Sequence, residues 1–204
     1  MSALLQILPA QQQVQLTEQT ALTDIFRPEV NLAVWQRQLD LALLQYTDQL
    51  VATTSSQFPS LQFVATPEEL QPLLEQRLPE GQGKALFIAD LVLMAQMLTC
   101  LMDCPAVGFR LKVLEKPMCP RFHTDHIAVR LLVSYAGTAT QWLKAPPAQQ
   151  DWQYRAENIQ EISIGDVALL KGSGWEHNEH GAIGHRSPAG VLPRLLLSLD
   201  PVGE

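Results

Sequence analysis

The stretch Arg121-Phe-His-Thr-Asp-His-Ile-Ala-Val-Arg-Leu-Leu-Val-Ser-Tyr135 passes from a polar cluster into a run of aliphatic and β-branched residues. The apolar run, residues 127–135, predicts a buried strand. His123 and Asp125 lie two positions apart just before it, and side chains at this spacing on a strand point to the same face. An imidazole and a carboxylate on one face can bind the same metal ion. We therefore expect His123 and Asp125 to be two ligands of a metal site.

The third ligand is expected among the histidines that follow. All five histidines lie in the second half of the chain, namely His123, His126, His177, His180 and His185. His185 is the preferred third ligand. One step along a strand should turn His126 to the opposite face, from which it reaches substrate only if the strand bends. The polar segment Gly174-Trp-Glu-His-Asn-Glu-His-Gly181 offers His177 and His180 as alternative ligands, and its Trp175 as part of a lid over substrate.

The first 105 residues are expected to be mainly helical. Apolar residues recur every three or four positions in residues 31–51, which predicts an amphipathic helix. Thr66-Pro-Glu-Glu69 is typical of a helix start, with threonine as the cap and proline in the first turn, and this second helix should end before Pro79. A third and largely apolar helix is predicted for residues 84–103, where we expect it to be buried.

Residues 106–204 have the pattern of an antiparallel β structure. Short alternating or β-branched runs predict strands at residues 108–115, 159–164, 167–170 and 195–199, in addition to the strand at 127–135. Glycine and proline separate these runs, which is typical of a sandwich or barrel. The predicted fold class is α+β, with an N-terminal helical half (residues 1–105) packed on the β half (residues 106–204) in one compact unit.

Composition limits the classes of function. The chain has 204 residues and a net charge of −7, so we expect no binding to nucleic acid, which needs a basic surface. The N-terminus lacks the basic segment of a secretory signal, and Asp90 and Gln96 interrupt the longest apolar stretch, so a cytoplasmic protein without membrane association is expected. Cys100, Cys104 and Cys119 are expected to be free thiols, the first two in the core.

The order of these features resembles the 2-oxoglutarate- and iron-dependent oxygenases. The His-x-Asp pair is followed by Gly165-Asp-Val-Ala-Leu-Leu170, then by His185, and nine positions later by Arg194. The resemblance covers about residues 109–200 and implies a double-stranded β-helix of the jelly-roll or cupin type. It also implies that His123, Asp125 and His185 bind Fe(II) and leave three positions open for co-substrate and oxygen.

The same resemblance implies roles for residues around the metal. Arg194 would pair with the far carboxylate of 2-oxoglutarate, for which a planar guanidinium is well suited. Ser198 or Tyr135 would add a hydrogen bond to this co-substrate, and Arg121 and Arg186 would lie beside the ligands. The implied activity is hydroxylation of a small-molecule or other substrate that the sequence does not identify.

A resemblance over nearly the whole chain is to an uncharacterised bacterial family, domain of unknown function 1826. Its residues here are Arg27-Pro-Glu-Val-Asn-Leu-Ala-Val-Trp-Gln-Arg37, Met118-Cys-Pro-Arg-Phe-His-Thr-Asp125, Gly165-Asp-Val-Ala-Leu-Leu-Lys-Gly172, His185-Arg-Ser-Pro188 and Arg194-Leu-Leu-Leu-Ser-Leu-Asp200. Members are often encoded near zinc-handling GTPases, which implies a link to zinc homeostasis.

Zinc therefore defines the alternative function. A non-catalytic zinc-binding protein on a cupin-like barrel needs a fourth protein ligand, for which His177, His180 and Cys119 are the candidates. A zinc hydrolase, with water at an open position, is a third hypothesis. An arginine directed into the pocket with three protein ligands favours the oxygenase, and a fourth His or Cys ligand favours the zinc carrier. The helical half could also support a homodimer.

Overall fold

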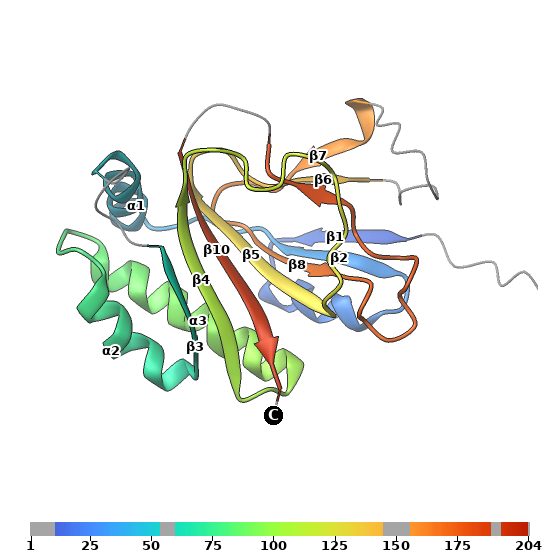
Figure 1. The fold of residues 1–204 in the computed structure, drawn as a ribbon, viewed down its shortest axis with the longest axis horizontal. Coiled ribbons are helices and arrows are strands. Elements are labelled where there is room, and N and C mark those ends of the chain that lie inside the picture. The colour runs from blue at the N-terminus through green and yellow to red at the C-terminus, as the bar shows by residue number, and fades with distance from the viewer. Residues whose placement is uncertain (1–10, 54–59, 145–155, 189–192, 204) are drawn as a thin grey trace, which may run out of the picture.

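The computed structural model describes residues 11–53, 60–144, 156–188 and 193–203, and its centre is a seven-stranded sheet (Figure 1). Across the sheet the order is β1-β2-β8-β5-β10-β4-β3, and every neighbouring pair is antiparallel except β1 and β2. The strands are β1 Gln12–Leu16, β2 Val30–Trp35, β3 Leu61–Ala65, β4 Ala106–Leu114, β5 Val129–Ala136, β8 Val167–Lys171 and β10 Arg194–Val202. A second sheet has the order β7-β6-β9, with β6 Gln141–Leu143, β7 Ile159–Glu161 and β9 His185–Arg186.

Helices cover one face of the large sheet. They are α1 Leu41–Thr53, α2 Pro67–Arg77 and α3 Lys84–Met102, and two 3₁₀ segments, η1 Gln19–Phe26 and η2 Ala156–Asn158, complete the described elements. Figure 1 shows α3 behind β3, β4 and β10, with α2 beside α3 at the β3 edge of the sheet. Leu131, Val133 and Tyr135 of β5 are fully buried in one apolar cluster with Phe87 and Leu91 of α3. Removal of this apolar surface from water is the main force that holds the helices on the sheet.

Alternation along β5 assigns its two faces. Because successive side chains of a strand point to opposite faces, Arg130, Leu132 and Ser134 face away from the helices. Leu132 belongs to a second apolar cluster between the two sheets. That cluster also contains Leu32, Val34, Ala168, Leu170 and Leu196 of the large sheet, with Trp142, Ile162 and Ile183 from the region of the small sheet. Arg130 and Ser134, the polar residues of β5 on this face, therefore lie beside a small apolar core.

Helix α3 is, among the described residues, the one helix long and apolar enough to cross a membrane by length and composition. Its Phe87, Leu91, Met94 and Leu98 are fully buried in the core on the helical side of the sheet. It also contacts β4 and β10. Its place is that of a core helix packed on a sheet.

Several predicted elements are confirmed in the structure. Helix α2 begins after a capping box between Thr66 and Glu69 and ends at Arg77, before Pro79. Helix α3 and the strands β4, β5, β8 and β10 lie where their sequence patterns predict them, within a few residues. A mixed α/β structure with a large, mainly antiparallel sheet is thus established.

Other expectations about the fold are wrong. The helix predicted for residues 31–51 begins only at Leu41, because residues 30–35 form β2, which is paired on both sides. The first 105 residues also contribute β1 and β3 to the large sheet, so they do not form a separate helical half. The large sheet is not closed into a barrel, since β1 and β3 are its two edges. Cys100 is exposed and Cys104 lies beyond the end of α3, so these thiols are not a buried pair.

Candidate metal centre

The His-x-Asp pair lies in the connection between β4 and β5. Contrary to expectation, it is not part of a regular strand, since β5 begins only at Val129. His123 instead forms an isolated antiparallel bridge with His185 of β9. The two residues exchange both backbone hydrogen bonds, from His123 N to His185 O at 3.0 Å and from His185 N to His123 O at 2.9 Å. Backbone pairing therefore brings together two histidines that are 62 positions apart in the sequence.

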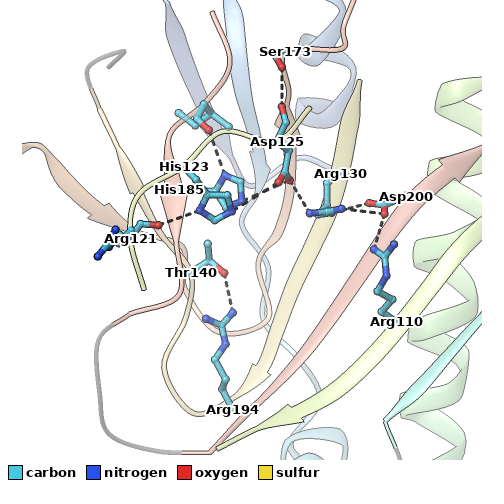
Figure 2. A network of polar contacts seen from close by, with 11 residues as sticks. Arg110, Arg121, His123, Asp125, Arg130, Thr140, Ser173, His185, Arg194 and Asp200 are labelled. Carbon is cyan, nitrogen blue, oxygen red and sulfur yellow. Dashed lines mark hydrogen bonds and ion pairs between the residues drawn. The ribbon is translucent and has the colours of Figure 1, made fainter. Parts of the chain in front are cut away.

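His123, Asp125 and His185 form one cluster whose potential ligand atoms lie within 4.8 Å of one another. His123 Nε2 is 3.9 Å from Asp125 Oδ1, and His185 Nε2 is 3.7 Å from Asp125 Oδ2. The centres of the two imidazole rings are 4.5 Å apart, and Figure 2 shows them next to the carboxylate. Two imidazoles and a carboxylate at this spacing are a suitable donor set for a divalent transition metal.

The backbone also orients both imidazole rings. Nδ1 of His123 lies 3.1 Å from Arg121 O, and Nδ1 of His185 lies 3.3 Å from Ile183 O. A ring nitrogen that donates to a carbonyl carries the proton, so Nε2 of each ring keeps a free lone pair directed toward Asp125. Burial lowers the pKa of His185 well below its usual value. Both effects favour the neutral imidazole that a metal requires.

The loop with the ligands rests directly on the backbone that follows β8. Gly172 N donates to Ala128 O, Ser173 N donates to Asp125 O, and Gly174 N donates to Ile127 O. A Cβ atom on Gly172 would lie 2.0 Å from Ile127 O, and one on Gly174 would lie 2.3 Å from His126 O. The absence of side chains at these two positions therefore allows the close approach that fixes the ligand loop.

Arg130 is a further functional candidate beside Asp125. Simple alternation along one strand would turn it away from Asp125 unless a bulge intervened, but the two residues are not on one continuous strand. Arg130 Nη1 lies 2.8 Å from Asp125 Oδ2, and Arg130 also pairs with Asp200 of β10. Arg110 Nη1 lies 2.6 Å from Asp200 Oδ2 and extends this line of contacts (Figure 2).

Arg194 lies buried at the beginning of β10, with 3% of its surface exposed. Its Nη2 donates to Ser134 Oγ at 3.1 Å and to Thr140 Oγ1 at 2.8 Å. Its Nε and Nη1 are also buried, yet no group in the described ranges accepts a hydrogen bond from them. In Figure 2 the guanidinium is directed toward the two histidines, with Thr140 between. Burial lowers the pKa of Arg194 to about 10, so the group is still a cation at neutral pH.

A small pocket connects the cluster with the face of β10, and about 70 Å³ of it is open to water-sized molecules. Its lining includes both histidines and residues from both sheets, which are Met118, Cys119, His123, Arg130, Leu132, Thr140, His185, Arg186, Ser187, Leu196 and Ser198. This volume is smaller than that of typical small-molecule sites, which is roughly 300–1,000 Å³. Of the predicted co-substrate residues, Ser198 lies on this wall, whereas Thr140 is a lining residue that the sequence reading missed.

Tyr135 is not in this pocket. Its hydroxyl donates to Asp90 Oδ2 of α3 on the helical side of the sheet, and its ring is fully buried there. The prediction that Tyr135 contacts the co-substrate is therefore wrong. The cause is parity, since Ser134 faces away from the helices, where it bonds Arg194, and its neighbour must face the helices.

The remaining histidines do not join the cluster. His126 is exposed and its Nδ1 lies 3.2 Å from Ser173 Oγ, while His177 and His180 are exposed on the segment after β8. Trp175 packs against Phe26 and over Lys171, so it does not form a lid over the pocket. The fourth-ligand role considered for His177 and His180 has no support in the described structure.

Of three further predicted residues, one has an exposed side chain and two line the pocket. Arg121 contributes its carbonyl oxygen to His123, while its side chain is exposed. Arg186 lines the pocket, with its guanidinium 4.4 Å from the centre of the Phe122 ring and its Nε bonded to Gln141 Oε1. Cys119 lines the pocket but is not part of the three-residue ligand cluster.

The sequence model of a family described as "Protein of unknown function (DUF1826)" matches residues 17–200. No curated protein sequence matches the chain.

Solved structures show a similar fold. The dioxygenase for auxin oxidation 1 from Arabidopsis thaliana, in a binary complex with 2-oxoglutarate, is similar with a TM-score of 0.59 and 11% identity, over 95% of this chain and 93% of that chain. A prolyl-4-hydroxylase from Pseudomonas putida matches with a TM-score of 0.47 and 9% identity, over 91% of this chain and 98% of that chain. At this level of identity, the first likeness shows a shared fold.

Proposed function

The chain belongs to the DUF1826 family, whose description names no activity, and from the site itself we propose that it is a metal-dependent oxygenase that uses Fe(II) and 2-oxoglutarate to hydroxylate a substrate. The observation that carries the proposal is the buried guanidinium of Arg194, which has unpaired donors on the same side of the sheet as a His-Asp-His cluster.

The residues present fit a divalent iron. Two neutral imidazoles and one carboxylate form the facial arrangement that non-haem Fe(II) oxygenases use, and it leaves coordination positions for small molecules. His123 and His185 would bind through Nε2, and Asp125 would bind through its carboxylate. His123 is the most exposed of the three side chains, which leaves the cluster accessible from the pocket.

The residues also fit an anionic co-substrate. Leaving two buried guanidinium nitrogens without acceptors costs free energy, about 1–3 kcal/mol for each buried unsatisfied group. Arg194 itself lies behind Thr140 of the pocket wall, and a carboxylate that reached it would accept from these donors and pair with the buried positive charge. Thr140 and Ser198 offer hydroxyl groups on the same wall, so a dicarboxylate could bind the metal at one end and Arg194 at the other.

Bound Fe(II) and 2-oxoglutarate would supply the redox chemistry, in which oxygen is reduced, 2-oxoglutarate is converted to succinate and carbon dioxide, and a substrate C–H bond is hydroxylated. The chain itself contributes orientation and exclusion of water. His123, Asp125 and His185 would hold the metal on one side. Arg194 and Thr140 would bind the far carboxylate, and Leu132 and Leu196 line the pocket with apolar surface.

The zinc-carrier hypothesis has less support. A structural or storage zinc site takes four protein ligands. Over the ranges that the structure describes, the cluster has three, and Cys119 is not among them. A zinc hydrolase needs only three ligands, but it gives no reason for a buried cation with unpaired donors beside the pocket.

Calorimetric titration of 2-oxoglutarate into the Mn(II)-loaded protein without oxygen tests the proposal. We expect binding that depends on Mn(II), and a loss of about 100-fold in affinity in Arg194→Met, since charge-assisted hydrogen bonds contribute about 2–3 kcal/mol. Arg194→Lys should retain part of the affinity, because it keeps the charge without the planar fork.

Arg121→Met is the matched control, because its side chain is exposed and only its backbone contacts His123. With Fe(II) and oxygen, the wild-type protein should also release succinate from 2-oxoglutarate. Absence of 2-oxoglutarate binding in the metal-loaded wild type, or equal binding in Arg194→Met, contradicts the proposal.

A further inference from the structure

Four charged side chains of alternating sign run from the metal cluster across the large sheet. Asp125 contacts Arg130, Arg130 contacts Asp200, and Asp200 contacts Arg110. They come from the ligand loop, from β5, from β10 and from β4, so the line crosses three neighbouring strands (Figure 2). Two carboxylates and two guanidinium groups balance each other, which makes their partial burial tolerable.

The Arg130 guanidinium is fixed in one orientation. Its Nε lies 2.7 Å from Asp200 Oδ1 and its Nη2 lies 3.1 Å from Asp200 Oδ2, which is a bidentate pair. This pair leaves Nη1 for Asp125, and that atom lies 2.8 Å from Asp125 Oδ2. The position of one oxygen of the Asp125 carboxylate is therefore set by Arg130 of β5.

We propose that Arg130 is a positioning residue for the metal ligand Asp125. It holds Oδ2 so that the carboxylate coordinates the metal through a single oxygen in one fixed orientation. The inference rests on the metal site of the proposed function and adds to it the residue that determines how the carboxylate binds.

Two physical effects follow from this contact. Without a partner, the Asp125 side chain could rotate, or bind the metal through both oxygens and occupy a position that co-substrate needs. The hydrogen bond from Arg130 prevents both. Asp200 acts on the metal only through Arg130, because it contacts Arg130 and Arg110 and not the cluster.

Cobalt(II) is a suitable probe, because its visible absorption depends on the number and type of its ligands. We expect Arg130→Gln to bind Co(II) about 10- to 100-fold more weakly than the wild type, the range typical for loss of an outer partner of a ligand. We also expect its absorption spectrum to change, as the carboxylate becomes free to coordinate through two oxygens. Arg130→Lys should restore part of the affinity, because an ammonium group can hold one oxygen.

Arg110→Gln is the matched control. It removes an arginine from the same line of charges without touching Asp125, so its Co(II) spectrum should be unchanged and its affinity within about threefold of wild type. In Arg130→Gln, the Asp200 carboxylate keeps only Arg110 as a partner. The double variant Arg130→Gln/Asp200→Asn removes the charge of this carboxylate as well. It should fold better than Arg130→Gln and bind Co(II) equally weakly.

The outcomes separate this inference from the proposed function. If the wild-type protein binds Co(II) but Arg130→Gln and the double variant keep its affinity and spectrum, Arg130 is only a structural ion pair and the inference fails alone. An equal loss in Arg110→Gln also overturns it, because the effect would then be general electrostatics. If the wild type binds no divalent metal, the proposed function fails and the inference fails with it.

Discussion

The hydroxyl of Tyr135 donates a hydrogen bond of 2.5 Å to Asp90 Oδ2 and so ties the central strand β5 to helix α3. Asp90 also binds the guanidinium of Arg37, whose Nε donates to Gly165 O at 2.7 Å. This buried network fixes the helical side of the strand whose other face carries Arg130 and Ser134.

Tyr135→Phe should therefore lower stability and leave ligand binding unchanged. Loss of a buried hydrogen bond to a charged group costs about 1–3 kcal/mol in the free energy of unfolding. Urea unfolding measures this cost, and calorimetry with Mn(II) and 2-oxoglutarate measures binding. A fall in 2-oxoglutarate affinity at unchanged stability would restore Tyr135 to the co-substrate site.

Thr140→Val should weaken 2-oxoglutarate binding without weakening metal binding. The substitution keeps the volume but removes the acceptor at 2.8 Å from Arg194 Nη2, so the guanidinium loses an anchor. A net loss of about 1 kcal/mol corresponds to about fivefold in affinity. Thr140→Ser retains the hydroxyl and should behave like the wild type in the same titration, and equal losses in both variants would contradict this role.

Single alanine substitutions should separate the ligands from the other histidines. His123→Ala, Asp125→Ala and His185→Ala should each reduce Co(II) affinity by at least about 100-fold, because each removes one of three ligands. His126→Ala and His177→Ala are matched controls, since both side chains are exposed and lie outside the cluster. Metal affinity measured by competition with a chelator decides the matter, and undiminished affinity in His185→Ala would refute the assignment.

Lys171 predicts a pH dependence of stability that is independent of the metal. Its Nζ donates to Arg27 O at 2.9 Å and lies over the Trp175 ring, and burial lowers its pKa from 10.5 to about 8. Between these two values the unfolded chain binds the proton and the folded protein does not, so the stability contributed here rises with pH. The full difference corresponds to at most about 3 kcal/mol.

Unfolding by urea between pH 7.5 and 9.5 measures this contribution. The wild type should gain stability relative to Lys171→Met as pH rises, because methionine has similar length and no proton to release. Parallel pH curves for the two proteins would show that Lys171 stays charged in the folded state.

Residue type and order in the sequence predicted that His123, Asp125 and His185 come together, without knowledge of the local backbone. His123 and Asp125 were expected on a strand and are found in a loop. They still lie beside His185, because an imidazole and a carboxylate can be brought together by a loop as well as by a strand. Helix α2 was predictable to its ends because Thr66 and Pro79 are local signals.

The errors have a common physical origin in strands that are buried on both faces. Residues 30–34 of β2 are all buried, so no alternation of polar and apolar residues distinguishes the strand from a helix. In β5, nearly every residue is buried, so the sequence cannot show whether Ser134 or Tyr135 faces away from the helices. The contact between Arg130 and Asp125 was not predictable, because the start of the strand at Val129 sets the parity and is not visible in the sequence.

Gly172 and Gly174 are in contact with the ligand loop although neither offers an atom to a metal. Any side chain at Gly172 would overlap Ile127 O, and any at Gly174 would overlap His126 O. In a comprehensive mutational scan, these two positions would therefore rank with the ligands in intolerance to substitution. Intolerance to substitution would therefore not distinguish a metal ligand from a residue that only supports the loop. A side chain at either glycine would inactivate the site by displacing the ligands, although all of them would still be present.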